Sequence, residues 1–267
     1  MTRIDEKFRT LKAHGHKGFV AYICVGDPGL DETVDTVLRL EEQGADIVEL
    51  GVPFSDPLAD GRVNQEATAR ALAAGMSMPG VFRCIEAIRK QSQVPLLLFT
   101  YANPIYAYGF DRAVKSAASA GADGFLLLDL PVEEADEFAG LLKRRALNNV
   151  TLVAPTSTEE RIERIARAAT GFLYCVSREG VTGAQESLSP SAARLLKKAR
   201  QATDLPMALG FGISTPDQAR AAARHADAIV VGSAIVAKFH ECGNSPEGRR
   251  RAARWTGKMI RAVKEPV

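Results

Sequence analysis

The stretch that decides the fold is Glu49-Leu50-Gly51-Val52-Pro53-Phe54-Ser55-Asp56-Pro57-Leu58-Ala59-Asp60-Gly61. It begins as a short apolar strand and ends as a loop. Side chains of a strand alternate between two faces, so Glu49 shares a face with Ile47 and lies opposite Val48 and Leu50. In a parallel sheet that is covered by helices both faces are buried. We therefore expect Glu49 to point into an interior.

A buried carboxylate is costly unless it is paired or its pKa rises. A raised pKa suits a general acid–base group that works near neutral pH. Pro53 and Pro57 stiffen the following loop, which can place Asp60 beside Glu49. The alternative is that Glu49 is a structural ion-pair partner and that Asp56 and Asp60 are ordinary turn residues.

Eight short apolar runs recur along the chain, and amphipathic stretches fill the gaps between them. Several runs follow a Gly/Ala/Asp punctuation such as Gly44-Ala45-Asp46, which is typical of a helix end that leads into a strand. The runs are Phe19–Val25, Ile47–Val52, Pro95–Tyr101, Gly124–Leu128, Thr151–Ala154, Phe172–Val176, Pro206–Leu209 and Ala228–Val231. This alternation predicts an α/β fold, a single (β/α)8 barrel domain over residues 1–267. An open doubly wound sheet is the competing architecture, but no GxGxxG follows the first strand.

Helices outside the simple alternation are also predicted. Arg3–His14 reads as an extra N-terminal helix that caps the bottom of the barrel. Between Gly61 and Gln93 there is room for more than one helix, with breaks at Gly75 and at Pro79-Gly80. The C-terminal segment Glu247–Lys264 carries Arg249, Arg250, Arg251, Arg254, Lys258 and Arg261, which predict a solvated basic helix face.

Composition excludes several classes of function. The 267 residues are 46% hydrophobic and carry a formal net charge of +2, which argues against nucleic acid as a partner. The four cysteines show no CxxC spacing and the four histidines no ligand pattern, so we expect no metal and a reducing, cytoplasmic setting. The sequence contains no apolar stretch of about 18 residues, so no membrane span is predicted, and the N-terminus lacks the apolar core of a signal peptide.

Glycine-rich turns follow the seventh and eighth strands. They read Gly210-Phe211-Gly212 and Gly232-Ser233, and each leads into a helix. Such turns expose backbone N–H groups that bind phosphate, so the substrate is expected to carry a phosphate monoester. Gly183, after the sixth strand, adds a third set of donors. The alternative is that these glycines only permit tight turns.

Aromatic residues near the strand ends predict a flat apolar pocket. Tyr22 and Tyr174 alternate onto the interior face, with Phe99 and Phe211 nearby, although each alone is compatible with an ordinary core position. The segment from Gly180 to Leu188 is either a lid or an ordinary mobile loop. Together these features indicate acid–base chemistry on a small phosphorylated molecule, without naming it.

At this point the sequence closely resembles the tryptophan synthase alpha chain family. The opening stretch matches the signature of that family. Further matching motifs follow in the family's order over nearly the whole chain: Gly26-Asp27-Pro28, Asp129-Leu130-Pro131, Ser177-Arg178-Glu179-Gly180-Val181-Thr182-Gly183, Gly210-Phe211-Gly212-Ile213-Ser214 and Gly232-Ser233-Ala234-Ile235-Val236.

The resemblance implies a TIM barrel that cleaves indole-3-glycerol phosphate to indole and glyceraldehyde 3-phosphate. By carry-over Glu49 moves protons at the glycerol hydroxyl and at indole C3, and Asp60 holds the indole N–H. Thr182 would tie the lid loop to Asp60. The phosphate would be held by Gly183, Gly212, Gly232 and Ser233, and the indole framed by Tyr22, Phe99, Tyr174 and Phe211. The family pairs with a β chain in an αββα complex; pyridoxal phosphate belongs to that β chain, so no cofactor is expected here.

Two features depart from the family pattern. Arg62 and Asn64 stand where proline and isoleucine are usual, so the packing of the loop and its contact with the β chain are open. Tyr22 replaces a common phenylalanine and adds a hydroxyl to the pocket. Three alternatives remain: a free-standing lyase that releases indole, a non-catalytic activating subunit, and another phosphate-binding barrel such as an isomerase. Intact Glu49 and Asp60 disfavour the last two.

Overall fold

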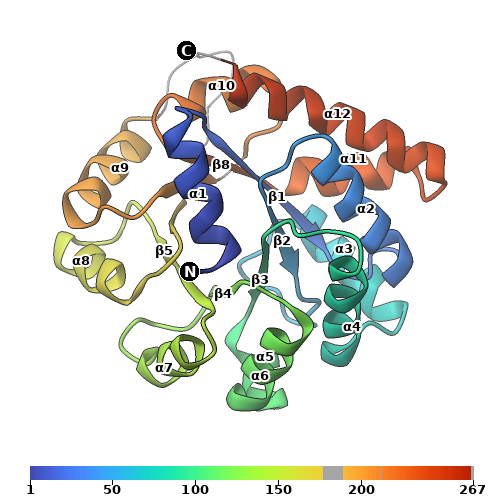
Figure 1. Cartoon of the computed structure of the whole chain (residues 1–267), viewed down its shortest axis with the longest axis horizontal. Coiled ribbons are helices and arrows are strands. Elements are labelled where there is room, and N and C mark those ends of the chain that lie inside the picture. The colour runs from blue at the N-terminus through green and yellow to red at the C-terminus, as the bar shows by residue number, and fades with distance from the viewer. Residues whose placement is uncertain (177–188, 211, 266–267) are drawn as a thin grey trace.

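Eight parallel strands pair in chain order and close into a barrel, with β8 hydrogen-bonded to β1 (Figure 1). The computed structural model describes residues 1–176, 189–210 and 212–265. The strands are β1 (Gly18–Cys24), β2 (Ile47–Gly51), β3 (Leu96–Thr100), β4 (Gly124–Leu127), β5 (Asn148–Val153), β6 (Leu173–Val176), β7 (Met207–Gly210) and β8 (Ala228–Val231). The predicted barrel is confirmed, and the open sheet is excluded because the ladder closes on itself.

Helices surround the barrel. Two helices connect β2 to β3, and two more connect β3 to β4. The described helices are α1 (Arg3–Ala13), α2 (Leu30–Glu42), α3 (Arg62–Ala73), α4 (Met78–Arg89), α5 (Ala102–Tyr108), α6 (Phe110–Ala120), α7 (Asp136–Arg144), α8 (Glu159–Ala168), α9 (Pro190–Ala202), α10 (Pro216–Ala223), α11 (Ser233–Cys242) and α12 (Pro246–Lys264). No single helix in the described ranges is long and apolar enough to cross a membrane, and only α3 with α4, a pair bent by 97°, meets the length and composition test jointly.

Side-chain alternation along the strands creates two apolar cores. On β2, Val48 and Leu50 pack into the layer between barrel and helices, whereas Ile47 packs into the barrel interior. The interior core also contains Val20, Leu97 and Val150 from three other strands. Glu49 therefore shares its face with Ile47 and points inward, as the alternation predicts.

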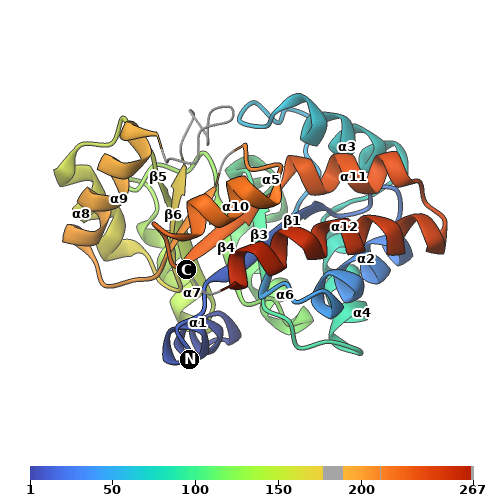
Figure 2. The same cartoon turned by 90° about the horizontal axis from the view of Figure 1, so that it is seen from above.

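Helix α1 closes the lower end of the barrel, as predicted. Ile4, Phe8 and Leu11 are buried in the interior core, and the ring of Phe8 lies 5.5 Å from that of Phe172. The Arg3 guanidinium donates to Asp123 at 3.0 Å. Figure 2 shows α1 at the opposite end of the barrel from α3. The other end is therefore the one at which side chains after the strands can form a site.

The same pair of hydrogen bonds recurs four times at the lower end of the barrel, near α1. A residue that lies directly before β2, β4 and β8, and three residues before β6, makes two hydrogen bonds with one residue at the start of the preceding odd-numbered strand. Its backbone N–H donates to that residue's carbonyl oxygen, and its side-chain oxygen accepts that residue's N–H. The pairs, with the side-chain distances, are Asp46 with Phe19 (2.9 Å), Asp123 with Leu96 (2.8 Å), Thr170 with Asn149 (2.7 Å) and Asp227 with Met207 (2.8 Å). The barrel thus consists of four similar two-strand units.

Two local predictions are wrong. Pro79 and Gly80 do not break a helix but lie in the first turn of α4, where proline costs nothing because its missing N–H would be unpaired anyway. Arg249 is not on a solvated face: its side chain is only 13% exposed and pairs with Asp35 of α2. The other five basic residues of the predicted face are exposed.

Candidate active site

Glu49 is the buried carboxylate at the centre of the site. It lies on β2 with no exposed surface, and neither carboxylate oxygen has a hydrogen-bond partner within the described residues. Burial alone raises the pKa of Glu49 from 4.5 to about 8. Glu49 therefore forms no ion pair with any described residue, which contradicts the structural alternative for these residues. With a pKa of about 8, it holds a proton at neutral pH.

Three of the four predicted aromatic residues come together around Glu49. Tyr22 of β1 is in register with Glu49, and its ring meets that of Phe99 edge-on at 5.0 Å. Burial raises the pKa of Tyr22 and of Tyr174 well above the ordinary value, and the charge of Glu49 raises both further. Both tyrosines therefore lie near this carboxylate. Phe211 lies outside the described residues.

Two strand glycines make room for the tyrosine hydroxyls. A Cβ atom added at Gly51 would overlap the hydroxyl of Tyr22, and one added at Gly210 would lie 2.5 Å from the hydroxyl of Tyr174. Neither glycine was predicted to shape the pocket. The available signal is that a glycine inside a strand often marks a close approach by another group.

Asp60 follows β2 at the end of the stiff loop and is half-buried. The Tyr101 hydroxyl donates to Asp60 Oδ2 at 3.0 Å and accepts the Ala59 N–H at 2.9 Å. Asn64 Nδ2 donates to Asp60 Oδ1 at 3.4 Å. Burial raises the pKa of Asp60, and these two side-chain hydrogen bonds oppose the rise.

Glu49 and Asp60 both lie near Tyr22. Burial is the main cause of the raised pKa of Tyr22, and the charges of Asp60 and Glu49 raise that pKa further, which indicates that both carboxylates lie near the ring. Asp56, by contrast, is exposed and accepts from the neighbouring Ser55 hydroxyl, as expected for a turn residue. Tyr101 was missed by sequence reasoning because it lies beyond a different strand, β3.

The sequence predicts an anion site at the start of α11. Gly232 is its N-cap residue and Ser233 its first residue, and among the described residues no side chain caps this terminus. Its backbone N–H groups are thus available to a phosphate. Gly232 adjoins Tyr22, since a Cβ atom added at Gly232 would lie 3.4 Å from the Cβ of Tyr22. Gly212 has φ of +68°, a conformation that favours glycine. Thr182 and Gly183 lie outside the described residues.

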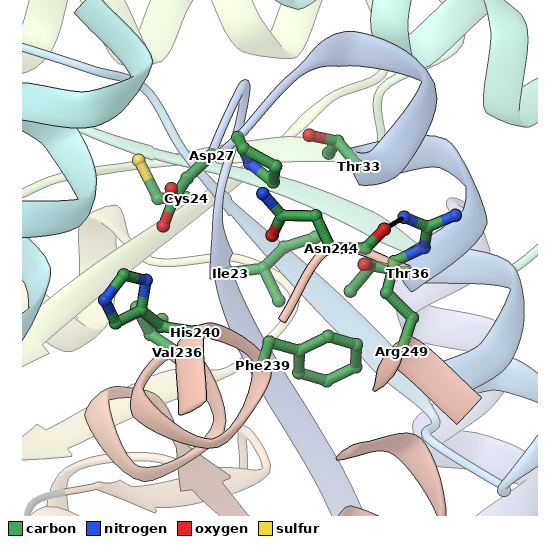
Figure 3. Close-up of a pocket in the computed structure, with 11 residues that line it drawn as sticks. Ile23, Cys24, Asp27, Thr33, Thr36, Val236, Phe239, His240, Asn244 and Arg249 are labelled. Carbon is green, nitrogen blue, oxygen red and sulfur yellow. Dashed lines mark hydrogen bonds between the residues drawn. The ribbon is translucent and has the colours of Figure 1, made fainter. Parts of the chain in front are cut away.

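A separate small cavity lies on the outer side of β1, between α2 and the α11–α12 region (Figure 3). Asp27 and His240 border one side, and Phe239 and Arg249 the other. Its volume of about 30 Å³ holds one or two water molecules. That volume is too small for a molecule the size of an indole ring. Across the described ranges no group of three or more His, Cys, Asp or Glu residues is placed to hold a metal ion.

Comparisons with known proteins agree on one family. The family model described as "Tryptophan synthase alpha chain" matches residues 8–264. The tryptophan synthase alpha chain of Solibacter usitatus is 51% identical over 236 residues, covering 88% of each chain. That of Geobacter sulfurreducens is 46% identical and covers 100% of this chain and 99% of its own.

Solved structures match the chain over most of its length. The tryptophan synthase alpha subunit of Legionella pneumophila superposes with a TM-score of 0.91 at 35% identity and 98% coverage of both chains. A structure of the tryptophan synthase a2b2 complex from Pyrococcus furiosus matches with a TM-score of 0.85 at 35% identity, covering 92% of this chain and 99% of that one.

Proposed function

The chain belongs to the tryptophan synthase alpha chain family, and we propose that it cleaves indole-3-glycerol phosphate to indole and D-glyceraldehyde 3-phosphate. Membership supports a lyase role. The observation that carries the specific reaction is Glu49, a buried carboxyl group without a partner in the described residues and with a pKa of about 8. Such a group can both give and take a proton near neutral pH.

Two proton transfers through Glu49 account for the cleavage. Protonated Glu49 gives its proton to indole C3, and Asp60 stabilises the positive charge that develops at the ring N–H. The Glu49 carboxylate then takes the proton from the glycerol hydroxyl next to the ring. That oxygen forms the aldehyde C=O, the bond between the ring and the glycerol breaks, and its electron pair restores the aromatic indole. Glu49 ends protonated, as it began.

The residues around Glu49 support this substrate. Tyr22, Phe99 and Tyr174 are proposed to contact its flat ring, and Gly212, Gly232 and Ser233 to bind the phosphate through backbone N–H groups. Thr182, Gly183 and Phe211 stay proposals from the resemblance. No step requires a cofactor, and pyridoxal phosphate is proposed to belong to the partner chain alone.

A tryptophan synthase β chain is the proposed partner, in an α2β2 complex. Leu58 is 92% exposed and Tyr106 is 72% exposed, and we propose that both side chains belong to the surface that the partner covers. Their segments are linked, because the hydroxyl of Tyr101, just before α5, accepts the Ala59 N–H. A partner covering this surface would press on the loop that carries Asp60. With four free cysteines, the reducing cytoplasm is the proposed compartment.

Indole release from indole-3-glycerol phosphate tests the proposal. The purified chain is assayed alone and with a β chain, beside Glu49→Gln, Asp60→Asn and the control Glu86→Gln, an exposed acid on α4. We expect a slow rate that rises with β, and a loss of about 10²-fold or more in Glu49→Gln, the usual contribution of a general acid–base group. A Glu49→Gln variant within tenfold of wild type would remove Glu49 from the mechanism. Fast release that ignores β would favour the free-standing lyase, and no release at all would contradict the proposed reaction.

A further inference from the structure

Asn64 contacts the carboxylate of Asp60 from the first turn of α3. Its Nδ2 donates to Asp60 Oδ1 at 3.4 Å, while the Tyr101 hydroxyl donates to Oδ2 at 3.0 Å. Each carboxylate oxygen thus has one side-chain donor and can still accept another hydrogen bond. The Asn64 contact is long, as such contacts often are before a ligand binds.

The rest of the Asn64 side chain is poorly accommodated. Its Oδ1 is buried and has no hydrogen-bond partner among the residues that the structure describes. A buried carbonyl oxygen without a donor destabilises a fold, and an apolar side chain of similar size avoids that loss. Stability of the fold therefore favours a residue such as leucine here and does not account for an amide. The contact with Asp60 does.

We infer that Asn64 is a positioning residue that, with Tyr101, holds the Asp60 carboxylate in place for the indole N–H. The inference rests on the proposed function. Tyr101 and Asn64 occupy one oxygen each, so the carboxylate cannot rotate without losing both bonds. Gln65, the next residue, is different: its amide donates to the backbone oxygen of Asp60 at 2.9 Å and not to the carboxylate.

The charge state of Asp60 depends on the same contact. Burial raises the pKa of Asp60, and the bonds from Tyr101 and Asn64 lower it. Among the described residues, the other titratable groups that interact electrostatically with Asp60 are Tyr22 and Cys24 on β1, and both are neutral at physiological pH because burial raises the pKa of each. Loss of the Asn64 amide therefore raises the pKa of Asp60 further and leaves less of it charged.

The variant Asn64→Leu tests the inference through kcat and KM measured across pH, together with the midpoint of urea unfolding. We expect kcat to fall by about tenfold or more, as for loss of a hydrogen bond to a charged group. The acid limb of the pH profile should move to higher pH, KM should change less than kcat, and the urea midpoint should stay the same or rise. A purely structural role would instead lower the urea midpoint and leave the acid limb in place.

Gln65→Leu is the matched control, because it removes a neighbouring amide but no bond to the carboxylate; its acid limb should not move. Asn64→Ala makes the same test if Asn64→Leu does not fold. Wild type and Asp60→Asn are assayed in parallel. If wild type releases indole, Asp60→Asn does not, and Asn64→Leu matches wild type in rate and acid limb, the positioning role is overturned while the proposed function stands. If wild type releases no indole, both are overturned.

Discussion

Glu49 combines an unfavourable place for a charge with the chemistry that the reaction requires. Its carboxyl group is fully buried, and within the described chain nothing pairs with it. An ionised carboxylate there is costly, so the proton stays until about pH 8. The site therefore carries a stability cost that a neutral side chain would not have at alkaline pH, and this cost can be measured.

We predict that Glu49→Gln is more stable than wild type, by an amount that grows with pH. The unfolded chain loses the Glu49 proton near pH 4.5 and the folded chain near pH 8. Between these values the folded state binds more protons, so wild-type stability falls by roughly 1 kcal/mol per pH unit relative to the glutamine variant. Urea midpoints at a series of pH values, with Glu86→Gln as control, measure the difference. A gap between the two proteins that does not change with pH would show that Glu49 is already ionised in the fold.

Residues were predicted when a local pattern pointed to them and missed when only the fold brings them near. Glu49 stood out because it interrupts an apolar strand. Tyr101 directly follows β3 and donates to Asp60. Gly51 and Gly210 matter only because the hydroxyl of a tyrosine on the neighbouring strand lies against each of them. No sequence spacing encodes those approaches.

At the scale of elements, apolar runs located all eight strands, and the ends differ by up to three residues. The largest difference is at β5, which begins at Asn148 because polar Asn148 and Asn149 continue the ladder. Polar residues inside a strand conceal its start, because apolar pattern is the signal that sequence reasoning uses.

Helix α1 is an element whose contribution is to stability and not to chemistry. It buries Phe8 against Phe172 at the end of the barrel away from the candidate site. We predict that Phe8→Ala lowers stability by about 3–5 kcal/mol. The corresponding fall in Tm is roughly 6–20 °C.

Thermal unfolding followed by circular dichroism measures that loss, and indole release well below the transition should remain close to wild type. The control is Arg9→Ala, since Arg9 is exposed on the same helix and pairs only with the neighbouring Glu6 among the described residues. A large loss of activity in folded Phe8→Ala protein would mean that α1 influences the site through the barrel.

At the scale of the molecule, four two-strand units share one polar device at the lower end. Three of the four acceptors are aspartates, and each also pairs with a basic residue. Asp123 pairs with Arg89 of α4, Asp227 with Arg200 of α9, and Asp46 with Lys264 of α12. The fourth acceptor is Thr170, which is uncharged. The short Gly/Ala/Asp sequences that precede the even-numbered strands thus contain the residues that make these hydrogen bonds. The hydrogen bonds to the odd-numbered strands were not predicted.

The four acceptors should differ in their contribution to stability, because their surroundings differ. Asp123 is 3% exposed and its partner Arg89 is 10% exposed, whereas Asp227 and Arg200 are 38% and 45% exposed. We predict that Asp123→Ala costs about 3–5 kcal/mol, since it leaves a buried guanidinium without its partner and the Leu96 N–H unpaired. Thr170→Val removes one hydrogen bond and no charge, and should cost about 1 kcal/mol.

Urea unfolding of Asp123→Ala, Thr170→Val and the exposed control Asp204→Ala ranks these effects. Catalysis in the folded variants should persist, because the device lies at the end of the barrel opposite the loop of Asp60. Equal losses in Asp123→Ala and Thr170→Val would mean that the hydrogen bond to the odd strand alone holds each unit and that the buried ion pair adds nothing. A larger loss of stability in Asp123→Ala would mean that the ion pairs of these aspartates also stabilise the packing of the helices on the barrel. The same residues would then determine both the strand register and the positions of the helices.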